Sequence, residues 1–215
     1  TGGLTVTLPA SGNLAPPGYY WLFIVNNNGV PSAGQLLSLQ LAFQQEVGTN
    51  GVVSIEAERF HARIDQGGHS WNRAAVAGQS GVGAMEAQPN AGATVNTGYV
   101  AGSPRLDYWV NFNRTGTHYV WLRLRGPTAA DDSIHAGLDG RANSTADRIS
   151  AMSTTFVWTK ATLDGPVARV NVPTTGLHRV SIWMRQDGAQ LDKVLLTASS
   201  TFVPTGTGPA ESAPY

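Results

Sequence analysis

The sequence predicts an all-β protein: a β-sandwich of the jelly-roll type, preceded by a partial immunoglobulin-like sandwich segment. Two observations support this fold class. Short apolar runs with a period of two recur along the chain, and 25 glycines and 12 prolines supply turns between them. No window of about 12 residues has the period of an amphipathic helix.

The bulk composition narrows the function. The 215 residues are enough for one sizeable core or two small ones. The formal net charge is zero and only 13% of residues are charged, which argues against nucleic acid or an anionic membrane as the partner. The chain has no cysteine, which excludes disulfides and thiolate metal sites. No apolar run approaches the roughly 18 residues of a membrane span. This turn-rich composition suits a secreted, extracellular protein.

The first predicted unit covers residues 1–43, with strands at 4–8, 19–25 and 35–43 and a turn at 26–29. Three strands with so much apolar surface cannot bury it alone, because a sandwich needs a second sheet. We therefore interpret this unit as part of a larger sandwich, whose other strands come from upstream or from another surface.

A linker is predicted at 44–50, and the second unit covers residues 51–199. Its predicted strands lie at 52–58, 84–87, 106–112, 118–125, 133–139, 156–163, 168–172, 178–185 and 191–197. Their regular, turn-bounded spacing is typical of a jelly-roll sandwich. Residues 200–215 have the composition of a linker or tail.

The second unit begins and ends with acidic strands. Alternate residues of a strand point to one side, so Glu56 and Glu58 present two carboxylates roughly 6–7 Å apart. If the segment 191–196 pairs beside them, Asp192 adds a third. Three convergent carboxylates favour a hard cation such as Ca²⁺. The simpler alternative is that these acids are solvated on the outer face, and the spacing alone favours it.

The second unit resembles carbohydrate-binding modules of families 6 and 35. The matching motifs lie at 55–58, 97–100, 106–110, 176–180 and 190–194. The resemblance implies a structural Ca²⁺ held by Glu56, Glu58 and Asp192, and it reverses the preference for solvated acids.

The same resemblance implies a sugar cleft at the loop ends. Its aromatic side chains would be Tyr99 and Trp158, and Gln190 would read the hydroxyl groups. The families have asparagine at this last position, so the identity of the ligand does not carry over. Trp71, within the polar stretch 67–73, is a further candidate loop aromatic. The alternative for each aromatic is a place in the core.

The first unit resembles the end of the C-terminal sandwich domain of galactose oxidase and glyoxal oxidase, on the motifs at 6–9, 15–26 and 29–32. In that family the copper ligands come from parts of the chain that precede this stretch. The resemblance therefore implies common ancestry or a parent polypeptide, without copper chemistry.

Alternation predicts a second surface. Trp121, Arg123 and Arg125 share one face of the strand 118–125, and Trp183 and Arg185 share one face of the strand 178–185. If both strands lie in one sheet, its outer face combines tryptophan with arginine. We rank the uses of this face as a protein interface first, a seat for the first unit second, and an acidic-polysaccharide site third.

The sequence thus predicts a secreted, non-catalytic, Ca²⁺-stabilised module within a larger extracellular enzyme. Its predicted partner is a polysaccharide, with an acidic polysaccharide as one candidate. Catalysis is disfavoured because neighbours on one strand do not straddle a substrate bond. The alternative is a structural subunit. In it, residues 1–43 complete a sandwich in a neighbouring copy by strand addition, giving a homo-oligomer or filament.

Overall fold

The structure, a computed structural model, describes residues 18–214. The chain divides into two compact units, Thr1–Leu41 and Ala42–Tyr215. The boundary lies two residues before the predicted one, because Phe43 already belongs to a sheet of the second unit. The strand predicted at 4–8 lies outside the described residues.

The described part of the first unit is an antiparallel hairpin of β1 (Gly18–Leu22) and β2 (Gln35–Leu39). Its loop is held by Asn26, whose side-chain oxygen accepts two backbone N–H groups at 3.0 Å each. Tyr19 and Trp21 are 78% and 64% exposed. The hairpin therefore leaves large aromatic surface uncovered in this structure.

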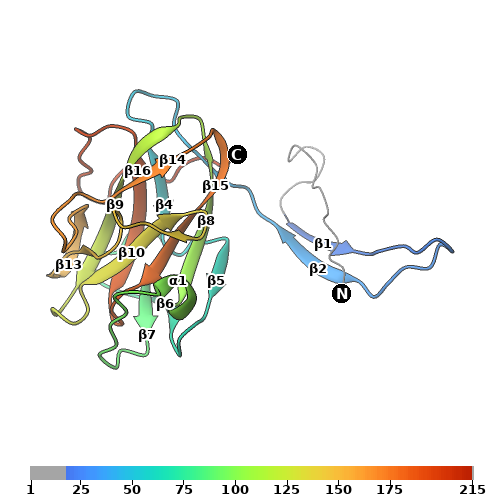
Figure 1. Cartoon of the computed structure of the whole chain (residues 1–215), viewed down its shortest axis with the longest axis horizontal. Helices are drawn as coiled ribbons and strands as arrows, with labels where there is room; N and C mark the ends of the chain where they lie inside the picture. Colours follow the sequence, from blue (N-terminus) through green and yellow to red (C-terminus); the bar gives the residue numbers. More distant parts are fainter. Residues whose placement is uncertain (1–17, 215) are drawn as a thin grey trace. The chain divides into compact units, whose positions relative to one another are not determined.

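The second unit is a sandwich of two sheets (Figure 1). The β8 sheet contains, in spatial order, β11 (Arg141–Ala142), β10 (Ser133–Leu138), β15 (Gly176–Met184), β8 (Arg105–Phe112) and β3 (Phe43–Gln44), with β12 (Ile149–Ser150) beside β10 and β5 (Ala62–Ile64) beside β8. The β9 sheet contains β13 (Ser153–Thr159), β9 (Gly116–Gly126), β16 (Gln190–Thr197), β7 (Ala84–Gln88) and β6 (Ser70–Ala74), with β14 (Arg169–Val172) beside β9 and β4 (Val53–Glu56) beside β16. The described residues contain one helix, α1 (Tyr99–Gly102).

The core lies between the inner faces of the two sheets. On β8, every second residue from Leu106 to Phe112 is buried in it, and on β9 Val120, Leu122 and Leu124 are fully buried. This period of two is the pattern on which the strand prediction was based. Each of the nine strands predicted for the second unit is present, which confirms the all-β sandwich.

Strand β6 is an element that the sequence does not predict. It pairs antiparallel with β7 and places Trp71 opposite Ala87, with both side chains fully buried. The sequence does not indicate this strand, because the residues around Trp71 are polar or glycine and Trp71 is the one large residue of β6 that points into the core.

The segment 44–50 differs from the predicted linker, because Gln45 is completely buried. Its side chain donates to the carbonyl of Gly51 at 2.9 Å and accepts the backbone N–H groups of Asn113 and Arg114 at 3.0 and 3.1 Å. A buried amide that bonds three backbone groups fixes this segment to the sandwich.

The segment 200–215, predicted as a linker or tail, also differs from expectation, because its described part is bound to the β9 sheet and, at Ala213 and Pro214, to β3 of the other sheet. Gly206 accepts hydrogen bonds from Trp158 and Arg123, and Ser212 donates its N–H to Ser54. Phe202 packs against the small cluster around Trp121. We call residues 200–214 the C-terminal strap. Its low-complexity composition conceals an ordered segment that is bonded mainly through its backbone carbonyls.

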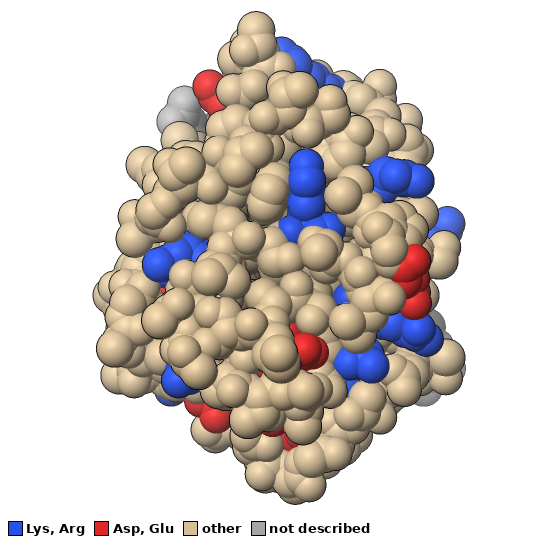
Figure 2. Space-filling model, turned by 90° about the vertical axis from the view of Figure 1, so that its left-hand side faces the viewer, with Lys and Arg blue, Asp and Glu red and all other residues tan. Residues whose placement is uncertain are grey.

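Charges of the two signs are interspersed on the face that Figure 2 shows, where lysine and arginine lie singly or in small groups among uncharged residues. Such a surface does not suit a polyanion bound along its length. Within the described residues, the structure has no helix that is long and apolar enough to cross a membrane.

Candidate functional site

The candidate site lies where the first and last long strands of the sandwich meet. Strand β4 buries Val53 and Ile55 completely and ends at Glu56. It pairs antiparallel with β16, which places Lys193 opposite Glu56 and Asp192 next to that pair. The structure therefore brings the two acidic segments together as the sequence predicts.

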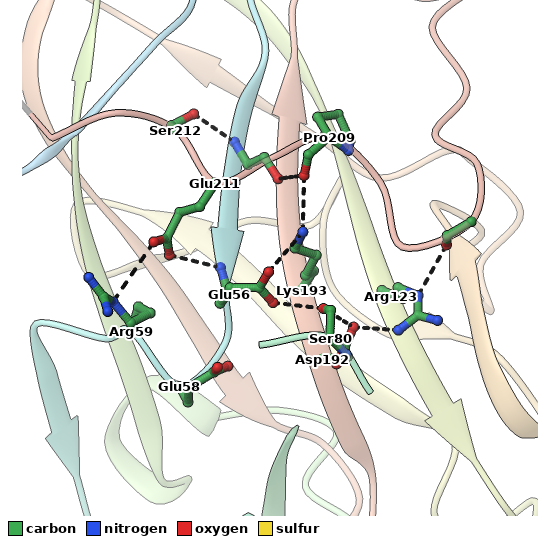
Figure 3. A network of polar contacts seen from close by, with 12 residues as sticks. Glu56, Glu58, Arg59, Ser80, Arg123, Asp192, Lys193, Pro209, Glu211 and Ser212 are labelled. Carbon is green, nitrogen blue, oxygen red and sulfur yellow. Dashed lines mark hydrogen bonds and ion pairs between the residues drawn. The ribbon is translucent and has the colours of Figure 1, made fainter. Parts of the chain in front are cut away.

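Glu58 reaches the same place from a turn rather than from the strand. The hydroxyl group of Tyr108 donates to the carbonyl of Ala57 at 2.7 Å, and the N–H of Arg59 bonds the carbonyl of Glu56 at 3.0 Å. These bonds fold the chain back after β4, so that the Glu58 carboxylate faces the carboxylates of Glu56 and Asp192 (Figure 3).

A loop that the sequence analysis did not identify crosses these three carboxylates. The backbone N–H of Ser80 donates to Asp192 at 2.7 Å, and its hydroxyl oxygen lies 2.7 Å from both Glu56 and Asp192. The N–H of Val82 donates to Glu58 at 2.8 Å. Between them, Gly81 has φ +58°, and a Cβ there would collide with a Glu58 oxygen. The glycine-rich run 78–83 is the only sequence signal for this loop.

Two of the three carboxylates have a basic partner (Figure 3). The Lys193 ammonium lies 2.9 Å from Glu56, and Nη1 of Arg123 lies 2.5 Å from Asp192, whose side chain is fully buried. Both ion pairs are largely removed from water, so removing one member of a pair would leave the other as an unpaired buried charge.

Glu58 has no basic partner among the described residues. Its Oε2 atom is buried and makes no hydrogen bond there. Burial raises the pKa of Glu58, and the charges of Glu56 and Asp192 raise it further. A positive charge bound next to Glu58 would therefore lower the electrostatic free energy of its ionised form.

The C-terminal strap closes the other side of the site. Glu211 accepts the N–H of Glu56 at 3.3 Å and lies 3.8 Å from Arg59. The carbonyl of Pro209 accepts a hydrogen bond from Lys193 at 3.0 Å (Figure 3). Lys193 therefore joins the strap to the carboxylate cluster.

The donor set fits Ca²⁺ in its chemistry. Carboxylate oxygens are the ligands that this cation prefers, and one oxygen of Glu58 is buried without a hydrogen-bond partner among the described residues. As the side chains stand in the described residues, no three of them are gathered closely enough around one point to hold a metal ion. Binding a cation would require Lys193 to move away from Glu56, or Arg123 to move away from Asp192. The Ca²⁺ ion therefore stays a prediction.

Two of the predicted sugar-binding aromatics are buried instead. Trp71 is completely buried on β6 and donates its indole N–H to the carbonyl of Pro104 at 3.0 Å. Tyr99 is 5% exposed, because it stacks on His135 with ring centroids 3.9 Å apart and contacts the edge of Trp183. Neither ring can offer a face to a sugar, and for these two residues the expectation is wrong.

The other two predicted sugar contacts lie on strands of the β9 sheet, whereas Tyr99 lies on α1. Gln190 is only 9% exposed and bonds Glu86 at 2.8 Å and Arg125 at 2.5 Å. Trp158 is half-buried, and its indole donates to the strap carbonyl of Gly206 at 3.2 Å. The structure therefore does not assemble the predicted cleft from its four residues.

The predicted tryptophan and arginine surface is also wrong. Strand β9, with Trp121, Arg123 and Arg125, lies in one sheet, whereas β15, with Trp183 and Arg185, lies in the other. Trp121 and Trp183 are 8% and 0% exposed. Alternation correctly gives the face within each strand, but it cannot tell which strands share a sheet.

The fold and the cluster together define a β-sandwich module whose first and last long strands share a carboxylate-lined site. Residues 47–211 match the model of the glycosyl hydrolase family 115 C-terminal domain. The chain therefore belongs to that family. Residues 1–39 match the galactose oxidase-like early set domain, which confirms the resemblance expected for the first unit.

Among curated proteins, the chain is similar to the uncharacterized protein P23 of Formosa agariphila, with 28% identity over 193 residues. The match covers 74% of this chain and 47% of that protein, so the chain spans about half the length of this curated relative.

Solved structures of both expected carbohydrate-binding families are among the similar folds. A family 35 module from Clostridium thermocellum has 13% identity and a TM-score of 0.45, covering 67% of this chain and 96% of that one. The C-terminal family 6 module of LamC from Zobellia galactanivorans has 15% identity and a TM-score of 0.41, covering 68% and 98%. A Podospora anserina β-(1,4)-mannanase with a family 35 module has 18% identity and a TM-score of 0.46, covering 71% and 29%.

Proposed function

We propose that this chain is a non-catalytic polysaccharide-binding module of a secreted glycoside hydrolase. The observation that carries the proposal is the family of residues 47–211, which is the C-terminal domain of a glycosyl hydrolase family. Such a module would hold a catalytic domain near its polymeric substrate. The module would then act outside the cell, because a polysaccharide is too large to enter it.

The acidic residues support binding rather than catalysis. A glycosidase needs two carboxyl groups that flank the scissile bond across an open cleft. Here Glu56 and Glu58 face each other and are bonded within the fold to Ser80 and Val82. We infer that they are structural, and that together with Asp192 they would hold one Ca²⁺. When bound, the ion would supply the positive charge that Glu58 lacks.

Affinity electrophoresis tests this proposal. The purified chain, loaded with Ca²⁺, is run through gels that contain single soluble polysaccharides, both neutral and acidic. We expect retarded migration on at least one of them, and no release of sugar on prolonged incubation. Unchanged migration on every polymer, or hydrolysis of one, would overturn the proposal.

A second function is favoured by the first unit. The hairpin β1–β2 exposes Tyr19, Trp21 and Phe23 by 78%, 64% and 50%. Large exposed apolar patches mark interaction sites. We infer as the alternative that this hairpin completes a sandwich in a neighbouring copy by strand addition, which would make the chain a structural subunit.

Light scattering coupled to size exclusion separates the two functions. The structural alternative predicts oligomers that grow with concentration and disappear when residues 1–41 are deleted. A monodisperse monomer for the full chain at about 100 µM would exclude it and leave the polysaccharide-binding module.

A further inference from the structure

One side chain joins the carboxylate cluster to the C-terminal strap. The Lys193 ammonium lies 2.9 Å from the Glu56 carboxylate and 3.0 Å from the carbonyl of Pro209 in the strap (Figure 3). Lys193 is only 3% exposed. A buried ammonium needs a counter-charge, which the neutral carbonyl of Pro209 cannot supply. The position of Lys193 therefore depends on Glu56.

The other basic residue of the cluster has more partners. Arg123 lies 2.5 Å from Asp192 and donates to the carbonyl of Gly78 at 2.9 Å. Its Nε atom also donates to the strap carbonyl of Gly206 at 3.3 Å. Lys193 has a flexible stem and one anionic partner, so it is the residue that a bound cation would displace more easily.

A cation in the cluster would lie close to Lys193. Ca²⁺ binds carboxylate oxygens at about 2.3–2.6 Å, so an ion on Glu56 would lie a few ångströms from the ammonium group, which is 2.9 Å from the same carboxylate. Like charges at such a distance repel strongly where water is excluded. The ion would also take over the charge of Glu56 and leave Lys193 without its counter-charge. The Lys193 ammonium would then have to reach water.

The strap covers the way from Lys193 to water. Residues two apart on a strand point to the same side, so Lys193 and Leu195 share one face of β16. Leu195 belongs to the small cluster on which Phe202 of the strap packs, whereas Val194 and Leu196 lie in the main core between the sheets. The exit of the ammonium from the cluster therefore runs through the strap.

The part of the strap that covers this exit, residues 205–209, lies between two anchors. On one side Phe202 packs on the sandwich, and on the other Ser212 is bonded to β4 at 2.8 and 3.0 Å. The segment between them contains two glycines and is bonded to the sandwich through the carbonyls of Gly206 and Pro209. A glycine-containing segment that is held through backbone carbonyls can lift as a loop while both anchors stay in place.

We propose that Ca²⁺ binding to the carboxylate cluster lifts residues 205–209 off the β9 sheet, and that Lys193 couples the two events. Without the ion the segment is closed over Lys193, and with the ion it is raised and uncovers Ser54. Because such coupling is reciprocal, a strap that is held down weakens Ca²⁺ binding. This inference rests on the Ca²⁺ site of the proposed function and adds a conformational change to it.

Thiol labelling tests this inference, because the chain has no cysteine of its own. Ser54 is 1% exposed and donates its hydroxyl group to the carbonyl of Pro209 at 3.2 Å, so Ser54→Cys places a single thiol under the strap. The full chain with this substitution is treated with Ellman's reagent in EDTA and in CaCl₂. We expect Ca²⁺ to speed the labelling by about tenfold, which is a typical size for coupling between two sites.

Ser103→Cys is the matched control, because Ser103 is also completely buried but precedes β8 of the other sheet. Simple stabilisation of the fold by Ca²⁺ would slow the labelling of both thiols. Faster labelling of Ser54→Cys alone therefore reports the lifted strap. Lys193→Met, combined with Ser54→Cys, removes the repelled charge and should abolish the acceleration.

The outcomes separate the inference from the site on which it rests. Unchanged or slower labelling of Ser54→Cys in Ca²⁺, in a protein whose Tm rises with Ca²⁺, would overturn the lifting of the strap and keep the Ca²⁺ site. Acceleration that persists in Lys193→Met would overturn the role of Lys193. If Ca²⁺ changes neither the Tm nor the labelling, the Ca²⁺ site fails and the coupling fails with it, whereas polysaccharide binding is judged separately by affinity electrophoresis.

Discussion

Replacing Glu58 by glutamine should make the module at least as stable without Ca²⁺ and much less sensitive to Ca²⁺. Ionised Glu58 is half-buried beside Glu56 and Asp192 and has no basic partner among the described residues. Its pKa is raised in the folded state, so its charge costs stability above that folded pKa, and the cost disappears as the pH falls below the unfolded value. Glutamine removes the charge and keeps the shape.

The size of the Ca²⁺ effect follows from linkage. A site with Kd of about 10 µM, at 1 mM free Ca²⁺, stabilises the fold by roughly 2.7 kcal/mol. For a domain of this size, that corresponds to a rise in Tm of about 5–10 °C. Glu58→Gln loses one of three carboxylates and should show less than a third of this rise.

Differential scanning calorimetry in EDTA and in 1 mM CaCl₂ measures both effects at pH 7.5. Glu46→Gln, which changes an exposed carboxylate outside the cluster, is the matched control. In EDTA, Glu58→Gln should melt at or above the wild-type Tm. An equal Ca²⁺-induced rise in wild type and Glu58→Gln, or no rise in wild type, would refute the reasoning.

Three further predictions concern the same unit. Arg123→Met leaves the fully buried Asp192 without its partner and should cost about 3–5 kcal/mol in urea unfolding; a loss below about 1 kcal/mol would contradict this role. Ending the chain at residue 200 uncovers Trp121, so the tryptophan emission should shift to the red and the Tm should fall; an unchanged spectrum would show that the strap does not cover this ring. Burial lowers the pKa of His135 to about 4, so stability should fall as the pH drops from about 6.5 to about 4; His135→Gln should flatten this fall, and an equal slope would exclude His135 as its source.

The strands could be predicted from the sequence because their burial repeats every second residue. This local signal marks Leu106 and Val110 as inward and Trp109 as outward. Alternation alone therefore predicts that the ring of Trp109, which is 41% exposed, points outward, whereas the family resemblance implies Tyr99 and Trp158 as the exposed rings. A motif match gives the position of a residue in the sequence but not the loops that cover it. It therefore could not show that Tyr99 is buried.

The pairing of sheets could not be predicted, because it depends on contacts between distant segments. Trp121 and Trp183 have similar surroundings in sequence, yet they lie on opposite sheets. The three carboxylates of the cluster could be predicted from the sequence, because they lie in short acidic strand segments. Ser80, which bonds two of them, comes from a glycine-rich loop whose place is set only by the fold.

Whether a cation joins the start and the end of the sandwich is tested most directly by X-ray diffraction from crystals grown in CaCl₂. The prediction is one anomalous peak bounded by Glu56, Glu58 and Asp192, with oxygen distances of about 2.3–2.6 Å. A cluster without such a peak, with Lys193 still on Glu56 and Arg123 still on Asp192, would contradict it.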